Sequence, residues 1–216
     1  MNNLKAKIER KIFDFKQPSG TSRGVLTKKY AWFISVWDEK NPSKKGLGEC
    51  SIIPGLSPDF ESFESYEQKL ESVCGNLDQD LTSWPSIRFG LETAILDWKN
   101  GGVGTYFNNA FSRGEQKISI NGLVWMGDEK FMRRQIEEKI LEGFTTIKMK
   151  IGSIDFDTEL KLLQTIRKRY TKDEITLRVD ANGAFEPGEV QEKLKLLSEL
   201  DIHSIEQPIR SGQWNH

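Results

Sequence analysis

The sequence predicts an α/β protein in which an α+β region is followed by repeated strand–helix units. Three observations support this prediction. The segments before about residue 50 are rich in aromatic and β-branched residues, two later segments carry apolar residues at helical spacing, and from residue 116 short apolar strands alternate with amphipathic helices. Alternation of this last kind is typical of βα units that build a parallel sheet.

The first half is expected to contain antiparallel strands, two loops and two helices. Tyr30–Trp37 and Gly46–Cys50 have the composition of strands and are separated by a polar turn. The segments 17–29 and 51–59 contain proline and glycine and show little periodicity, so both are predicted to be loops. The helices are predicted at Phe60–Asn76 and Pro85–Asn100.

The second half is expected to contain four strands with helices between them. Met132, Ile136 and Ile140 are four residues apart and predict the first of these helices, and a later helix is expected to begin near Pro187. The predicted strands are Ile118–Trp125, Thr145–Ile151, Glu174–Asp180 and Ile202–Glu206.

The second of these strands carries two lysines on one face. Lys148 and Lys150 alternate with three apolar residues. Because successive side chains of a strand point to opposite faces, the apolar set is expected to pack against helices and the lysines to face the other way. In a barrel of βα units that other face points inward, toward the mouth where the strands end.

Carboxylates end the next two predicted strands. Asp180 closes the third strand, and Glu206 closes the fourth, just before Pro208, which cannot continue a central ladder. A single charged residue at a strand end is usually one that enters solvent. Ions gathered inside a barrel, however, cost several kcal/mol each unless they are paired or bind a metal, so two lysines and two carboxylates at one rim predict a functional cluster.

Such a cluster suits proton abstraction next to a carboxylate, a reaction that builds negative charge on an enolate. Magnesium stabilises that charge and prefers hard oxygen ligands such as those of Asp180 and Glu206. A lysine acts as a base only if its pKa falls toward the working pH, and both desolvation and a neighbouring ammonium lower it. The adjacent pair Lys148 and Lys150 provides such a neighbour.

Three motifs resemble the muconate-lactonizing branch of the enolase superfamily. They are the K-x-K of Lys148-Met149-Lys150, the metal-binding segment Arg178–Phe185 and the E-Q-P segment Ile205–Pro208. Within that branch, four further segments are similar to o-succinylbenzoate synthases, and the resemblance covers nearly all of the chain. These segments are Gly48–Cys50, Ile53–Ser57, Ser86–Ala94 and Ile120–Trp125.

The resemblance implies an enolase-superfamily fold with two domains. Residues 1–110 are expected to form the α+β capping domain, with lid loops near 17–29 and 51–59 that close over the substrate and exclude water. Residues 111–216 are expected to form the first four strands of a (β/α)7β TIM-like barrel.

The implied reaction is the syn dehydration of succinyl-hydroxycyclohexadiene carboxylate to o-succinylbenzoate, a lyase step in menaquinone biosynthesis. By the same resemblance Lys150 is the base and Lys148 supports it and touches the substrate carboxylate. Asp180 and Glu206 are expected to bind Mg2+, with Mn2+ as an alternative, and Ser57 is expected to contact substrate.

The third metal carboxylate and a second barrel lysine of the family are expected beyond residue 216. We therefore expect the isolated chain to bind magnesium weakly and to turn over no substrate measurably. Two alternatives remain open: an N-succinylamino acid racemase or dipeptide epimerase, which uses the same lysines and metal, and a non-catalytic fragment that associates with itself.

The composition also limits the classes of binding partner that are expected. With 31 basic and 32 acidic residues, no charge excess favours a nucleic acid or an anionic membrane, so the charge predicts a small-molecule partner or none, and the resemblance implies that this partner is a small carboxylate. Cys50 and Cys74 form no CxxC pair, and no signal-like apolar run begins the chain, which together predict a cytoplasmic protein. His203 is expected to be structural, and Asn182 is compatible with a metal shell or a turn.

Overall fold

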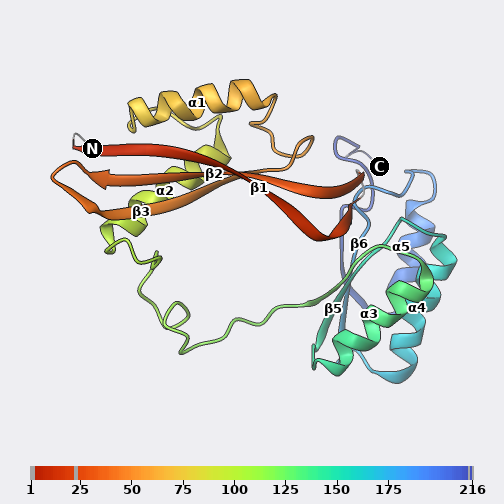
Figure 1. Ribbon diagram of the computed structural model, residues 1–216. Helices are drawn as coiled ribbons and strands as arrows, with labels where there is room; N and C mark the ends of the chain where they lie inside the picture. Colours follow the sequence, from red (N-terminus) through yellow and green to blue (C-terminus); the bar gives the residue numbers. More distant parts are fainter. Residues whose placement is uncertain (1–2, 22–23, 214, 216) are drawn as a thin grey trace. The chain divides into compact units, whose positions relative to one another are not determined.

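The computed structural model describes residues 3–21, 24–213 and 215 of the chain. These residues form two compact units, one of Met1–Pro18 with Leu26–Ile118 and the other of Ser19–Val25 with Ser119–His216. The first unit contains a three-stranded sheet with two helices, and the second a four-stranded sheet with three helices (Figure 1). The predicted α/β organisation, with an α+β first half, is confirmed.

The sheet of the first unit has the order β1-β2-β3. Its strands are β1 (Leu4–Thr21), β2 (Gly24–Asp38) and β3 (Asn41–Ile52). β2 and β3 are antiparallel, and Tyr30 lies opposite Ile52 in their register. The predicted antiparallel region is therefore confirmed.

The loop predicted at 17–29 is wrong for most of its length. β1 continues to Thr21 and β2 begins at Gly24. Pro18 is compatible with this arrangement because β1 lies at the edge of the sheet, where the N–H groups of alternate residues face away from the neighbouring strand. The other predicted loop begins later than expected, because β3 extends to Ile52 and irregular backbone and turns follow from Ile53.

The two helices of the first unit are α1 (Phe63–Gly75) and α2 (Pro85–Lys99). The Ser62 hydroxyl caps α1 by accepting the Ser65 N–H at 3.1 Å. Both helices contribute to one core with the sheet, so they cover the same face of it. The buried residues of that core include Trp32, Ile34, Val36, Cys50, Ile52, Tyr66, Leu70, Val73, Ile87, Leu91 and Ala94.

Glycines let α2 lie directly on β3. A Cβ atom on Gly48 would stand 1.8 Å from the carbonyl oxygen of Gly90, and a Cβ atom on Gly90 would stand 2.2 Å from the Cys50 sulfur. No side chain fits at these distances. The backbones of α2 and β3 therefore approach each other closely at Gly90 and Gly48.

The second unit has a parallel sheet of order β4-β5-β6-β7. Its strands are β4 (Gly122–Val124), β5 (Thr146–Lys150), β6 (Thr176–Asp180) and β7 (Ile202–Glu206), and its helices are α3 (Glu129–Leu141), α4 (Phe156–Arg169) and α5 (Val190–Ser198). Strands and helices alternate along the chain, so the predicted βα units are confirmed.

The first predicted strand of this unit is shorter than expected. Among the described strands β4 pairs only with β5, and Gly122 lies opposite Ile147. Because β5 begins at Thr146, the residues before Asn121 extend past the start of their only neighbour and find no ladder there. The expectation of a strand from Ile118 was therefore wrong at its beginning.

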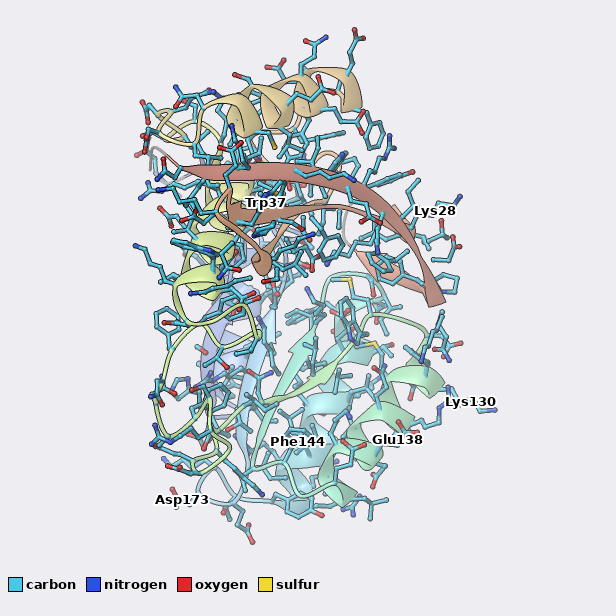
Figure 2. All side chains as sticks on the ribbon, turned by 60° about the vertical axis from the view of Figure 1, so that its left-hand side comes forward. Lys28, Trp37, Lys130, Glu138, Phe144 and Asp173 are labelled. Carbon is cyan, nitrogen blue, oxygen red and sulfur yellow. The ribbon has the colours of Figure 1, made fainter. Side chains whose placement is uncertain are left out.

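The helices of the second unit pack on one face of its sheet. The buried residues of this core include Met132 and Ile136 from α3, and Leu162, Leu163 and Ile166 from α4. In Figure 2 the labels Phe144 and Asp173 mark the loops that lead into β5 and β6, at the end opposite to the one where the strands terminate. None of the described helices is both long and apolar enough to cross a bilayer.

Candidate active site

The predicted alternation along β5 and β6 is present in the structure. Ile147 and Met149 of β5, and Leu177 and Val179 of β6, are fully buried in the core beneath the helices. Lys148 and Lys150 alternate with them and are only partly exposed. The charged set therefore lies on the face of the sheet that the helices do not cover.

The register of the sheet brings the charged strand ends together. Lys150 lies opposite Asp180, and Asp180 lies opposite Glu206. Each of the three is the last residue of its strand, and parallel strands end at a common edge. The row is extended by backbone hydrogen bonds from Ile151 N–H to the Asp180 carbonyl at 2.9 Å and from Ala181 N–H to the Glu206 carbonyl at 3.0 Å.

Lys148 bridges the two carboxylates. Its Nζ lies 2.6 Å from Oε2 of Glu206 and 3.4 Å from Oδ2 of Asp180. The side chains of Lys148 and Asp180 are 17% and 6% exposed, while that of Glu206 is 60% exposed. A positive charge is thus held between two carboxylates at the rim, one buried and the other open to solvent.

Lys150 shares the buried carboxylate with Lys148. Its Nζ lies 3.3 Å from Oδ2 of Asp180 and 3.2 Å from Oδ1 of Asn182. Both distances exceed the usual range for a charge-assisted hydrogen bond. The two lysines, Asp180 and Asn182 therefore form one connected cluster in which Lys150 is the more loosely held lysine.

Asn182 orients the carboxylate as well as the lysine. Its backbone N–H donates to Oδ1 of Asp180 at 3.1 Å and its side-chain amide donates to the same oxygen. The backbone of Asn182 has a φ of 48°, a left-handed conformation that asparagine tolerates better than most residues. The turn and the contact with the cluster, which the sequence left as alternatives, thus occur together.

The carboxylates change the proton affinity of Lys148. Burial lowers the pKa of this lysine, but the hydrogen bond to Glu206 and the negative charges of Asp180 and Glu206 outweigh it, so that the pKa is raised. Lys148 is therefore an ammonium in this arrangement. It supplies fixed positive charge at the rim.

A buried glutamate holds the loop that follows Lys150. The Glu159 carboxylate on α4 is fully buried and accepts the Gly152 N–H at 2.8 and 2.9 Å and the Ser153 N–H at 3.2 Å. Burial raises the pKa of Glu159, and the N–H donors act in the opposite direction. Gly152 has a φ of 92°, which lets the loop make this turn at little cost.

A cavity of about 600 Å3 adjoins the strand ends. It is bounded by the loops after β5, β6 and β7, and its lining includes Gly152, Asn182, Gly183, Gln207 and Arg210. The volume suits a small molecule. Asn182 lines this cavity and also contacts Asp180 and Lys150, so the cavity lies next to the charged cluster.

The oxygen donors of the cluster fit a hard divalent cation. Magnesium accepts one or two protein carboxylates and completes its shell with water and substrate oxygens. Asp180 and Glu206 both contact the ammonium of Lys148, so a positive charge already occupies the space between them. Among the described residues no group of three or more histidine, cysteine or acidic side chains is placed so that it could hold a metal ion, and the candidate ligands remain the two carboxylates that the sequence predicts.

Ser57 lies in the first unit, in the turn after β3. Its hydroxyl accepts the Ile53 N–H at 2.9 Å, and its own N–H donates to the Ile53 carbonyl at 2.9 Å. Ser57 also lines a cavity of about 290 Å3 together with Phe15 and Lys29. The hydroxyl thus stabilises its own turn, and its expected contact with substrate stays a prediction.

Three contributions to the site were absent from the sequence-based prediction. Trp125 follows β4 directly, and the Lys150 ammonium lies 5.5 Å from the centre of its ring. Gln135 and Glu159, both on helices, hold backbone at the ends of β4 and β5. An aromatic residue at a strand end could have been noticed in the sequence, but buried polar residues on helices carry no local signal of their partners. His203 is exposed on β7, with its Nδ1 3.2 Å from the Ser204 hydroxyl.

Comparison with known proteins gives the family. Residues 131–216 match the family model described as enolase C-terminal domain-like. The o-succinylbenzoate synthase of Desulfotalea psychrophila is 40% identical to the chain over 251 residues, covering 100% of this chain and 67% of that protein. The L-Ala-D/L-Glu epimerase of Bacillus subtilis is 26% identical over 141 residues, covering 64% of this chain and 38% of that protein.

Solved structures agree with the sequence relatives. The crystal structure of MenC from Desulfotalea psychrophila has a TM-score of 0.75 and 36% identity, over 99% of this chain and 66% of that one. The o-succinylbenzoate synthase of Thermosynechococcus elongatus, solved with Mg in its active site, has a TM-score of 0.72 and 22% identity, over 99% of this chain and 63% of that one.

These relatives confirm the predicted enolase-superfamily fold. The chain spans about two thirds of the length of the Desulfotalea synthase, 67% in sequence and 66% in structure. The identity to that synthase extends over the whole chain, both units included. The chain therefore belongs to the o-succinylbenzoate synthase family of the enolase superfamily.

Proposed function

We propose that the protein is a Mg2+-dependent o-succinylbenzoate synthase, which removes water from succinyl-hydroxycyclohexadiene carboxylate in a syn elimination. The observation that carries this proposal is the cluster at the strand ends, where Lys148 contacts both Asp180 and Glu206 and Lys150 contacts Asp180. The 40% identity to the Desulfotalea synthase favours this activity over others that such a cluster could serve.

In this proposal Lys150 is the acid–base residue. Its amine takes the proton from the carbon next to the substrate carboxylate, and the electron pair of that C–H bond passes into the carboxylate as an enolate forms. The enolate then expels the neighbouring hydroxyl group, to which the same ammonium returns the proton, so that water leaves. One side chain on one face of the substrate serves both steps, which accounts for syn geometry.

Lys148 has a different role. Its raised pKa keeps it charged, and the exposed part of its ammonium faces the same rim as Lys150. It would hold the substrate carboxylate by an ion pair and stabilise the second negative charge that this group gains. Asp180 and Glu206 would hold Mg2+, which supplies further positive charge to the carboxylate as the enolate develops.

Asn182 and Glu159 orient these groups. Asn182 fixes the Asp180 carboxylate through Oδ1, while Oδ2 faces the ammonium groups of Lys148 and Lys150. Glu159 fixes the loop after Lys150 through the N–H groups of Gly152 and Ser153. Such positioning limits the rotational freedom that the reacting groups lose on reaching the transition state.

Dipeptide epimerisation is the competing activity. A hydrophobic dipeptide epimerase of Enterococcus faecalis is 32% identical to the chain over 96 residues, which is 44% of this chain. Racemisation also begins with proton removal next to a carbonyl, so the cluster alone does not favour one reaction. The identity to the synthase extends over all of the chain, and this wider match is why we prefer dehydration.

The proposal is tested on the complete product of the gene, purified from a host strain that lacks its own synthase, with the 216-residue chain assayed in parallel. We expect the complete product to form o-succinylbenzoate with Mg2+, and the 216-residue chain to form none measurably. Lys150→Ala should abolish the activity, whereas Lys172→Ala, which removes an exposed lysine at 62% side-chain exposure, should retain it.

Epimerisation is measured on the same preparations. Dipeptides are incubated in D2O, and exchange at the α carbon is followed by NMR. Faster turnover of dipeptides than of the cyclohexadiene substrate would reject the synthase in favour of an epimerase. Inactivity of the complete product toward both substrates in the presence of Mg2+ would reject both assignments.

A further inference from the structure

Trp125 is the aromatic residue closest in the chain to the end of β4, and neither the proposed acid–base chemistry nor the metal site assigns it a role. It follows Val124, the last residue of β4, directly. The Lys150 Nζ lies 5.5 Å from the centre of its ring. This is within the range of a cation–π interaction, for which tryptophan is the best partner among the aromatic side chains.

The backbone of Trp125 is held by a buried side chain. Gln135 on α3 is 9% exposed. The Trp125 N–H donates to Oε1 of Gln135 at 3.0 Å, and Nε2 of Gln135 donates to the Trp125 carbonyl at 3.1 Å. Because β4 ends at Val124, these two backbone groups lie beyond the ladder, and the amide of Gln135 satisfies both of them.

The other contacts of Lys150 are weak, so an aromatic contact can determine the position of its side chain. Its two hydrogen bonds, to Asp180 and Asn182, are 3.3 and 3.2 Å long. Asp180 is shared with Lys148, which lies 3.4 Å from the same oxygen. A long lysine side chain with two weak bonds has several rotamers of similar energy, and a ring beside its end selects among them.

We propose that Trp125 is a positioning residue for Lys150. Gln135 holds the backbone of Trp125, and the indole keeps the lysine amine at the carboxyl ends of the strands. The inference rests on the proposed function, in which Lys150 is the acid–base residue. Trp125 is 39% exposed, so part of its surface is free to contact a ligand. A flat unsaturated ring, as in the proposed substrate, would be able to lie against that surface while Lys150 reaches its proton.

The contact is tested by NMR on the 216-residue chain with 13C at the ε carbon of lysine. A side chain held beside an indole shows upfield-shifted and unequal ε protons, because of the ring current and the fixed rotamer. The Lys150 signals are assigned with Lys150→Arg. We expect them to be shifted and unequal in the wild type, and to merge at the position of the exposed Lys172 signals in Trp125→Leu.

Two further variants separate positioning from a change in folding. Trp125→Phe keeps an aromatic ring and should retain part of the shift and the inequality of the ε protons. Gln135→Met leaves the indole in place but removes its anchor, and it should reduce both. The cation–π pair of Lys69 and Trp84, with Nζ 5.8 Å from the ring centre in the first unit, is the matched control, and its lysine signals should stay unchanged in all three variants.

The proposal is overturned if Trp125→Leu leaves the Lys150 signals shifted and unequal, or if Trp125→Phe loses them as completely as Trp125→Leu does. A change in the Lys69 signals of any of these variants would also overturn it, because the effect would then be a general loss of structure. The spectra need no substrate and no turnover. Failure of this inference therefore leaves the synthase assay unaffected, and an inactive enzyme would leave the contact intact.

Discussion

Replacement of Glu159 by alanine tests the anchor of the loop that follows Lys150. The carboxylate of Glu159 is fully buried and accepts the Gly152 N–H at 2.8 and 2.9 Å and the Ser153 N–H at 3.2 Å. A buried N–H that loses its partner costs about 1 to 3 kcal/mol. Gly152 and Ser153 are themselves exposed residues, so water replaces part of what is lost. We expect Glu159→Ala to lower the free energy of unfolding by about 2 to 3 kcal/mol.

The assay is urea unfolding at neutral pH, followed by circular dichroism, together with hydrogen exchange of the Gly152 and Ser153 amides. Glu189→Ala is the matched control. Glu189 pairs with Lys193 at 2.6 Å on the surface, with 47% of its side chain exposed, and its loss should cost much less stability than the loss of Glu159. A Glu159→Ala variant that loses no more than this control, with unchanged exchange of Gly152, would refute the role of the carboxylate.

Three further predictions concern the fold and the charges. Gly48→Ala should lower the free energy of unfolding by about 1 to 3 kcal/mol or more, because the new Cβ atom would lie 1.8 Å from the Gly90 carbonyl oxygen. A Cβ atom on Gly75 would have nothing within 4 Å, so Gly75→Ala should not destabilise the protein in the same urea titration. Burial lowers the pKa of Lys148, but Glu206 and Asp180 raise it by more. The ion pairs of Lys148 therefore stabilise the fold fully below the pKa of the unfolded chain, about 10.4, and this stabilisation is lost as the pH rises through the higher pKa of the folded chain. Above about pH 10 the wild type should thus lose more stability than Lys148→Met. Burial and the charge of Asp59 raise the pKa of Cys50 to about 12. A thiol reagent at mildly alkaline pH should therefore modify Cys74, which is partly exposed, and should react with Cys50 only when the protein unfolds. Equal reaction rates of the two thiols would contradict the burial of Cys50.

The second half of the fold was predictable because its signals are local. Alternation along β5 and β6 identifies both strands, their buried faces and the charged residues at their ends, and all of these lie where the sequence predicts them. Strand ends are harder to predict when a partner decides them. β4 begins only at Gly122, because β5 beside it begins at Thr146, and in the other sheet β1 continues to Thr21 and β2 begins at Gly24 as neighbouring strands.

The gathering of the charged residues at the strand ends was predictable from the sequence, but their contacts were not. The sequence suggests that Lys148 acts on Lys150 as a neighbouring ammonium. In the structure Lys148 instead bridges Asp180 and Glu206, at 3.4 and 2.6 Å, and shares Asp180 with Lys150. These contacts depend on the register of three strands and on side-chain rotamers, which the spacing of residues within a single strand does not specify.

In the proposed function, Asp180 and Glu206 together form a cation site at the ends of β6 and β7. The most direct measurement is the addition of small amounts of paramagnetic Mn2+ to the 15N-labelled chain, since broadening of amide signals locates even a weakly bound ion. We expect broadening centred on residues 180–182 and 206–207, and its loss in a variant that carries both Asp180→Asn and Glu206→Gln. Broadening centred on the acidic segment at 78–80 of the first unit, or unchanged in that double variant, would contradict the site.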